Sequence, residues 1–201
     1  MHHLTEGIRR FHNDVFPARA ELFRHLATTH RPSTLFISCS DARVVPELIT
    51  QQDPGELFVI RTAGNLVPAY ASGVDGVAAS IEYAVAVLGV SDIIVCGHSA
   101  CGAMTALAEH HDLTALPSIA DWLRHADASR ARTEPAAEND VSALVRENVL
   151  AQLANLATHP SVARALARET VRLHGWIFDI ATGAIDDATP AMERPAALTV
   201  V

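Results

Sequence analysis

A short apolar run, Ile93–Cys96, ends abruptly at Gly97 and is followed at once by His98 and Cys101. A continuous run of this length is typical of a strand that is buried on both faces of a parallel sheet. The strand would then lead into a helix, so the imidazole and the thiol would lie in one tight turn. Two side chains at this spacing can reach one metal ion, but a soft tetrahedral site needs at least one more ligand.

A second buried run, Leu35–Ser38, ends in the same way at Cys39. In open α/β sheets, sites form beyond the carboxyl ends of the strands, where neighbouring connections run in opposite directions. If the first and third strands are adjacent, the side chains of Cys39, His98 and Cys101 meet at this edge. Two thiolates and one imidazole suit Zn2+, with copper(I) and iron as competitors.

The expected strands and helices alternate along the chain. The strands are expected at 34–38, 56–60, 93–96 and 171–180, and the last turns at Thr182-Gly183 into a short return. Helices are expected at 74–88, 119–132 and 141–157, with a further one opening at 159–161. The stretch 74–88 is apolar nearly all round, which predicts a buried helix. Strands separated by helical crossovers predict an α/β fold with a mostly parallel central sheet flanked by helices.

The chain divides into three expected regions. Residues 1–30 form an N-terminal helical arm, because apolar residues recur between Glu6 and Thr29 in helical spacing that is interrupted at Pro17. This arm is expected to pack on a partner subunit. Residues 31–185 form the zinc-binding α/β domain, and residues 186–201, with two prolines, form a loose C-terminal tail.

Composition narrows the classes of protein further. The formal net charge of −8 disfavours a nucleic-acid surface. No apolar run approaches the roughly 18 residues that a membrane span needs, and the first residues lack the apolar core of a signal peptide. Two of the three cysteines are better explained as metal ligands than as a disulfide, and Cys96 is expected to be a packed core thiol. These features predict a cytoplasmic protein.

Asp41 lies two residues after Cys39, and Arg43 lies two residues after Asp41. In an extended segment their side chains would point to the same side as the thiol. Three protein ligands leave a fourth position open, as in catalytic zinc sites. Asp41 would orient zinc-bound hydroxide, or become a fourth ligand in a closed state, and Arg43 would hold it ionised and away from the metal.

Two features of the second motif point to catalysis. The thiol of Cys101, at a helix start, is expected to have a lowered pKa. The adjacent N–H of Gly102 is expected to bind a developing anion.

The motifs Cys39-Ser-Asp41-Ala-Arg43 and His98-Ser-Ala-Cys101-Gly102 together resemble those of the β-class carbonic anhydrases. The resemblance runs from about Thr34 to Gly183. It implies reversible hydration of carbon dioxide to bicarbonate by zinc-bound hydroxide, in a homodimer or homotetramer. The metal ligands and the Asp41–Arg43 dyad of that family match the residues identified above. The resemblance further implies a substrate pocket formed by Phe58, Ala63 and Tyr83, in which Phe58 and Tyr83 come from across a dimer interface. His30 stands where the plant-like branch has a substrate-binding glutamine.

Two alternatives stay open. The same fold and metal could hydrolyse carbonyl sulfide or carbon disulfide, because pocket access decides between these substrates. A non-catalytic zinc or redox-sensing module could also use the two cysteines. The pair of Asp41 and Arg43 argues against such a module, because a purely structural zinc site needs no gate at the fourth position.

Overall fold

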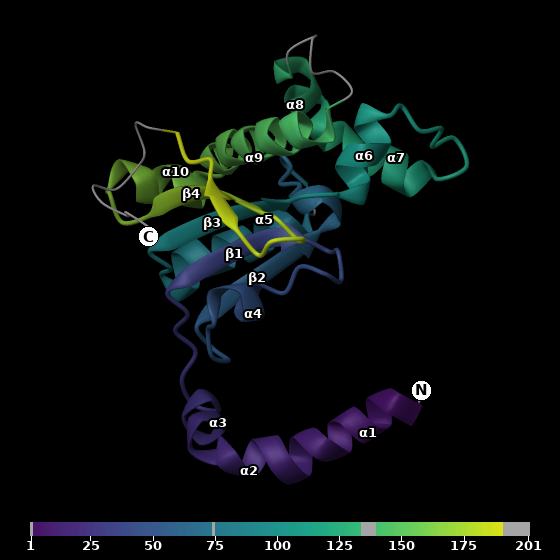
Figure 1. Ribbon diagram of the computed structural model, residues 1–201. Helices are drawn as coiled ribbons and strands as arrows, with labels where there is room; N and C mark the ends of the chain where they lie inside the picture. The colour runs from purple at the N-terminus through teal and green to yellow at the C-terminus, as the bar shows by residue number, and fades with distance from the viewer. Residues whose placement is uncertain (1, 74, 134–139, 191–201) are drawn as a thin grey trace. The chain divides into compact units, whose positions relative to one another are not determined.

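The computed structural model of the protein describes residues 2–73, 75–133 and 140–190. These residues form two compact units, one ending at Arg31 and the other beginning at Pro32. This division lies one residue from the boundary expected at residue 30. Figure 1 shows the helices and strands of both units.

The N-terminal unit is helical throughout most of its length. It contains α1 (His2–Arg10), a π-helical segment (Phe11–Val15), α2 (Phe16–Ala18) and α3 (Ala20–Leu26). Helical turns continue through Pro17, because a proline in the first turn of a helix gives up no hydrogen bond. The break expected at Pro17 therefore falls at Arg19 instead. Leu4 and Ile8 leave 62% and 70% of their surface exposed within this unit.

The α/β unit is built on one five-stranded sheet. Its strands are β1 (Thr34–Cys39), β2 (Leu57–Thr62), β3 (Asp92–His98), β4 (Arg172–Phe178) and β5 (Ile185–Asp187). They lie in the order β2-β1-β3-β4-β5, and only β5 runs antiparallel to its neighbour. The first and third strands are adjacent, with Ser38 beside Cys96. The predicted mostly parallel α/β sheet is therefore confirmed.

Helices surround this sheet. They are α4 (Pro46–Thr50), α5 (Gly76–Glu82), α6 (Gly102–Ala108), α7 (Pro117–Leu123), α8 (Asp127–Arg132), α9 (Val141–Thr158) and α10 (Pro160–Ala167). Side chains of α5, α9 and α10 form the main core with alternate residues of the strands. A second cluster is formed by side chains of α6, α7 and the start of α9, and it includes Cys39 and Cys101. None of the described helices is both long and apolar enough to cross a membrane.

Helix α9 lies along β3 and β4 (Figure 1) and packs closely against both. A Cβ atom added to Gly97 would lie 2.8 Å from Cγ2 of Val149, and one added to Gly175 would lie 2.9 Å from Cγ1 of the same valine. Both glycines thus provide the space in which one valine of α9 contacts the sheet. Because His98 follows Gly97, this contact fixes the end of β3 that carries the imidazole.

The structure differs from the expected helices at three places. Tyr83 and Val87 are 44% and 65% exposed, so the helix expected to be buried at 74–88 buries one face only. It changes at Tyr83 from α-helix to a π-helical segment, and its first expected residue lies outside the described residues. The helix expected at 119–132 is broken by a 3-10 turn at Arg124–Ala126. Helix α4 was not expected, because five residues are too few to show a periodicity.

The start of the expected C-terminal tail also differs. Asp186 and Asp187 belong to β5, and Ala188 and Thr189 are buried. The N–H of Gly175 donates to the hydroxyl of Thr189, which ties this segment to β4. Asp186 and Asp187 are therefore part of the sheet, and the next two residues are held against it. The remainder of the expected tail, 191–201, lies outside the described residues.

Candidate metal centre

The carboxyl ends of β1 and β3 bring three potential metal ligands together. Cys39 ends β1, His98 ends β3, and Cys101 caps the start of α6. Their ligand atoms all lie within 4.8 Å of one another, and all three residues are buried. Metal–ligand bonds of about 2.0–2.3 Å could join such atoms to one ion after small side-chain movements. The sequence expectation that these three side chains would meet at one edge agrees with this geometry.

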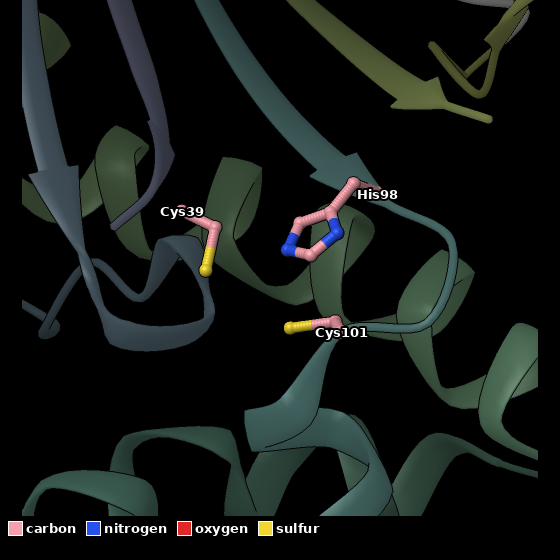
Figure 2. A group of neighbouring side chains, drawn as sticks. All are labelled: Cys39, His98 and Cys101. Carbon is pink, nitrogen blue, oxygen red and sulfur yellow. The ribbon is translucent and has the colours of Figure 1, made fainter. Parts of the chain in front are cut away.

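The imidazole of His98 is oriented for coordination. Its Nδ1 lies 2.9 Å from the carbonyl oxygen of Ser99, which can only accept, so Nδ1 carries the proton in this contact. In the neutral ring, Nε2 therefore presents its lone pair. Among the described residues, Nε2 is one of three buried side-chain nitrogen and oxygen atoms without a hydrogen-bond partner. Figure 2 shows it facing the two sulfur atoms. A hydrogen bond from the other ring nitrogen to a backbone carbonyl is typical of metal-binding histidines.

The sulfur of Cys39 lies among hydrogen-bond donors. The N–H groups of Asp41 and Gly64 each donate to it at 3.4 Å. A hydrogen bond from the thiol of Cys101 is the largest cause that lowers the pKa of Cys39 despite its burial, and the two N–H groups act in the same direction. The same contact with Cys39, together with burial, raises the pKa of Cys101. The lowered pKa expected at Cys101 from its place at a helix start is therefore found at Cys39 instead.

Burial and charge act in opposite directions on His98. Burial alone would lower the pKa of the imidazole, but the Cys39 sulfur, the Ser99 carbonyl and the Asp41 carboxylate together outweigh it, so the pKa of His98 is raised. The donor set thus concentrates negative charge on sulfur beside an imidazole. This set suits a soft or borderline divalent cation, and among first-row metals it suits zinc well.

Asp41 and Arg43 form a bidentate ion pair next to this group. Arg43 donates through Nε to Oδ1 at 2.9 Å and through Nη2 to Oδ2 at 2.6 Å, and its backbone N–H also donates to Oδ1 at 2.9 Å. These bonds hold the pKa of the Asp41 carboxyl well below its usual range. Oδ2 lies 3.9 Å from Nε2 of His98, so an ionised carboxylate borders the three ligand atoms.

The segment that brings Asp41 and Arg43 together is a turn and is not extended as expected. The N–H of Val44 donates to the carbonyl oxygen of Asp41 at 3.0 Å, and this bond closes the turn. The contact between the two side chains results from this turn, because an aspartate at such a position accepts the N–H two residues later. Arg43 also donates to the carbonyl oxygen of Ala100 at 3.0 Å and so links the two motif segments.

Arg61 holds the same turn from β2. Its guanidinium donates to the carbonyl oxygens of Cys39, Asp41 and Val44, at 3.0, 2.6 and 2.8 Å respectively. These three bonds fix the backbone that carries Cys39 and the ion pair. No periodicity or spacing in the sequence predicts that a strand residue contacts three carbonyl oxygens.

The remaining expected site residues lie in several different parts of the fold. Gly102 is the first residue of α6, and a Cβ atom added there would meet nothing within 4 Å. Ala63 directly precedes Gly64, whose N–H reaches Cys39. The rings of Phe58 and Tyr83 contact each other, with centroids 6.0 Å apart. His30 belongs to the N-terminal unit, so its role toward this site stays a prediction.

The roles of the polar residues of α9 were not predicted from the sequence. Asn148 and Gln152 are buried, and each bonds the segment after β2: Asn148 donates to the carbonyl oxygen of Gly64, and Gln152 accepts from the N–H of Val67. Asn155 adds a bond to the carbonyl oxygen of Val67 at 2.8 Å. A polar residue every three or four positions on a helix usually indicates a solvated face, so these buried contacts could not be predicted from the pattern.

Fold and site together define an α/β protein with a buried group of two thiols and one imidazole at the carboxyl edge of a parallel sheet, beside an ion-paired carboxylate. A family model described as carbonic anhydrase matches residues 34–185. A carbonic anhydrase of Pseudomonas aeruginosa is 57% identical over 198 residues, which cover 96% of this chain and 90% of that protein. The chain belongs to the β-carbonic anhydrase family, as the sequence predicted.

Further relatives agree with this assignment. Carbonic anhydrase 1 of Escherichia coli O157:H7 is 53% identical over 189 residues, which cover 92% of this chain and 86% of that protein. The solved structure of the β-carbonic anhydrase CcaA superposes with a TM-score of 0.89 at 41% identity, covering 94% of this chain and 92% of that one. The family consists of carbonate dehydratases, so the predicted enzyme class is also confirmed.

Proposed function

We propose that this protein catalyses the reversible hydration of carbon dioxide to bicarbonate with one Zn2+ held by Cys39, His98 and Cys101. The buried two-thiol, one-imidazole group carries this proposal, because its donor set fits zinc and Nε2 of His98 is unpartnered and faces the two sulfurs. Zinc bound there would supply Lewis-acid activation of water. Relatives with the name carbonic anhydrase support carbon dioxide as the substrate.

Asp41 and Arg43 have separate roles in this proposal. The ionised carboxylate of Asp41 can only accept hydrogen bonds, so it would orient a proton-bearing group of water or substrate beside the ligand atoms. Arg43 would keep this carboxylate ionised and turned away from the metal, because it occupies both carboxylate oxygens. The N–H of Gly102 would donate to the anion that develops on the substrate.

The substrate pocket and the assembly belong to the same proposal. Ala63, Phe58, Tyr83 and His30 would line the pocket, with Phe58 and Tyr83 supplied by a second copy of the chain in a homodimer or homotetramer. Exposed apolar side chains in the N-terminal unit, such as Leu4 and Ile8, support an oligomer, because burying them on a partner would remove them from water. A solved relative at 29% identity is one of two tetrameric β-carbonic anhydrases from Sordaria macrospora. The buried thiols fit the reducing cytoplasm.

A pair of cysteine variants tests the proposal. Cys39→Ala removes a ligand, whereas Cys96→Ala removes a buried cysteine that lies outside the group and serves as the matched control. We expect one zinc per chain in wild type and in Cys96→Ala, and little zinc in Cys39→Ala, by elemental analysis. Hydration of carbon dioxide, measured by stopped flow, should follow the zinc content and disappear with a chelator. Wild-type zinc content in Cys39→Ala would contradict the assigned site.

The same preparations distinguish the alternative substrates. Zinc-loaded protein that hydrolyses carbonyl sulfide or carbon disulfide but does not hydrate carbon dioxide would refute the proposed reaction while leaving the metal site intact. Zinc-loaded protein without any of these activities would instead indicate a structural or sensing site. Sedimentation that shows an active monomer at low concentration would contradict the shared pocket.

A further inference from the structure

The peptide between Ala63 and Gly64 has hydrogen bonds at both ends of its dipole. Its N–H, on Gly64, donates to the sulfur of Cys39 at 3.4 Å, and its carbonyl oxygen, on Ala63, accepts from Nε1 of Trp122 at 2.9 Å. The peptide is trans, because the described chain contains no cis bond. In a trans peptide the C=O and N–H point in opposite directions. A donor that fixes the oxygen therefore also fixes the direction of the N–H.

Packing leaves this peptide little freedom of its own. Gly64 has a φ of +72°, and a Cβ atom there would lie 3.0 Å from Cβ of Ala103 and 3.1 Å from Cε of Met104. The next carbonyl oxygen, on Gly64, accepts from Asn148, which is 1% exposed. These contacts hold the neighbouring atoms, but of the side-chain hydrogen bonds in the described part of the chain only the indole bond of Trp122 reaches the oxygen of the peptide itself.

Trp122 is well suited to act as a fixed donor. It lies in α7, is partly buried, and packs with the cluster that contains Cys39 and Cys101. Its ring also contacts the imidazole of His125, with centroids 5.2 Å apart. An indole N–H can only donate, so the direction of its bond to Ala63 is unambiguous.

We infer that Trp122 is a positioning residue for the metal site: its indole N–H orients the Ala63–Gly64 peptide so that the peptide N–H donates to the sulfur of Cys39. The inference rests on the proposed function, in which Cys39 is a metal ligand. Donation to a thiolate withdraws electron density from sulfur and fixes its direction. Residues that act on a ligand in this way typically change metal affinity or activity 10- to 100-fold when they are lost.

The test compares two tryptophan variants. Trp122→Phe keeps an aromatic ring but removes the donor, and Trp176→Phe makes the same change in the other tryptophan, which packs against Phe36 with centroids 6.1 Å apart. Zinc affinity is measured by competition with a chromophoric chelator. We expect Trp122→Phe to weaken zinc binding at least about tenfold and Trp176→Phe to bind as wild type does.

A spectroscopic measurement separates positioning from general loss of stability. In the cobalt(II)-substituted protein, loss of the N–H···S bond leaves a more electron-rich thiolate, so the thiolate-to-cobalt charge-transfer band should move to longer wavelength in Trp122→Phe only. An unshifted band with wild-type zinc affinity would overturn the inference. So would equal effects in both variants.

A second substitution covers the case in which Trp122→Phe does not fold. Benzothienylalanine at position 122 retains the shape of the indole and replaces its N–H by sulfur, so it removes only the donor. It should give the same band shift and loss of affinity, and wild-type values for both would overturn the inference. Wild-type protein that binds no zinc at all would refute the proposed metal site itself, a result that is distinct from any difference between variants.

Discussion

A single methyl group added at Gly97 should disrupt the contact between α9 and the sheet. The added Cβ would lie 2.8 Å from Cγ2 of Val149 and 3.1 Å from Cγ1 of Val145. Ordinary van der Waals contact begins at 3.4 Å, so strand and helix must separate by about 0.6 Å (3.4 − 2.8). Val149 cannot rotate away easily, because a helical valine has one preferred rotamer and its other methyl group already faces Gly175. Overpacking of this kind costs about 1–3 kcal/mol.

A double-mutant cycle measures this effect. Urea unfolding is recorded for Gly97→Ala, Val149→Ala and the double variant at one protein concentration and equal zinc content, because ligand and partner binding also change apparent stability. Removing the methyl groups of Val149 makes room for the new Cβ. The double variant should therefore be more stable than the sum of the single changes predicts, by at least about 0.5 kcal/mol. Additive effects would refute the clash as the cause.

Three further predictions concern other groups. Asp41→Asn should keep its zinc yet lose at least about 100-fold in the rate of carbon dioxide hydration by stopped flow, because the amide replaces an acceptor that does not bind metal; an unchanged rate would remove Asp41 from the mechanism. Burial alone would raise the pKa of Asp92, but hydrogen bonds from Arg172 and His174 outweigh it and lower the folded-state pKa, so this carboxylate stabilises the fold above pH 4 and loses that effect as the pH falls through the folded value. Asp92→Asn should thus unfold more easily in urea at pH 7, by about 1 kcal/mol, with the difference closing in acid; a pH-independent difference would contradict this account. Burial raises the pKa of Cys96 to about 12, so its thiol should be alkylated at pH 8 only after denaturation, as mass spectrometry can show; labelling of the native protein would contradict its burial.

The sequence predicted those parts of the fold that depend on continuous apolar runs. The runs that became β1 and β3 are uninterrupted and end at residues with metal-binding side chains, so both the strands and their functional edge could be inferred. The short connection at Pro46–Thr50 has no periodicity to detect, and α4 was missed. The exposure of Val87 could not be inferred either, because exposed and buried apolar residues look alike in a sequence.

The site was predictable only as far as its reactive side chains. Thiols and an imidazole are rare and have few alternative uses, so their spacing carried information. The groups that orient them are ordinary residues whose contacts arise far along the chain. Trp122 meets Ala63 across 59 positions, and Asn148 meets Gly64 across 84. Such contacts depend on the packing of whole helices, which single-sequence patterns do not encode.

The buried amides of α9 have a consequence for the uniqueness of the native packing. A purely apolar helix could slide by one turn along a sheet and still bury a similar area. In α9, such a slip would strip Asn148 and Gln152 of their partners on the segment after β2, and each buried polar group left unsatisfied costs about 1–3 kcal/mol. The hydrogen bonds thus destabilise shifted arrangements of the helix by more free energy than they contribute to the native one. Helix α9 consequently has one register on β3 and β4. This register in turn determines the geometry at the ends of β1 and β3.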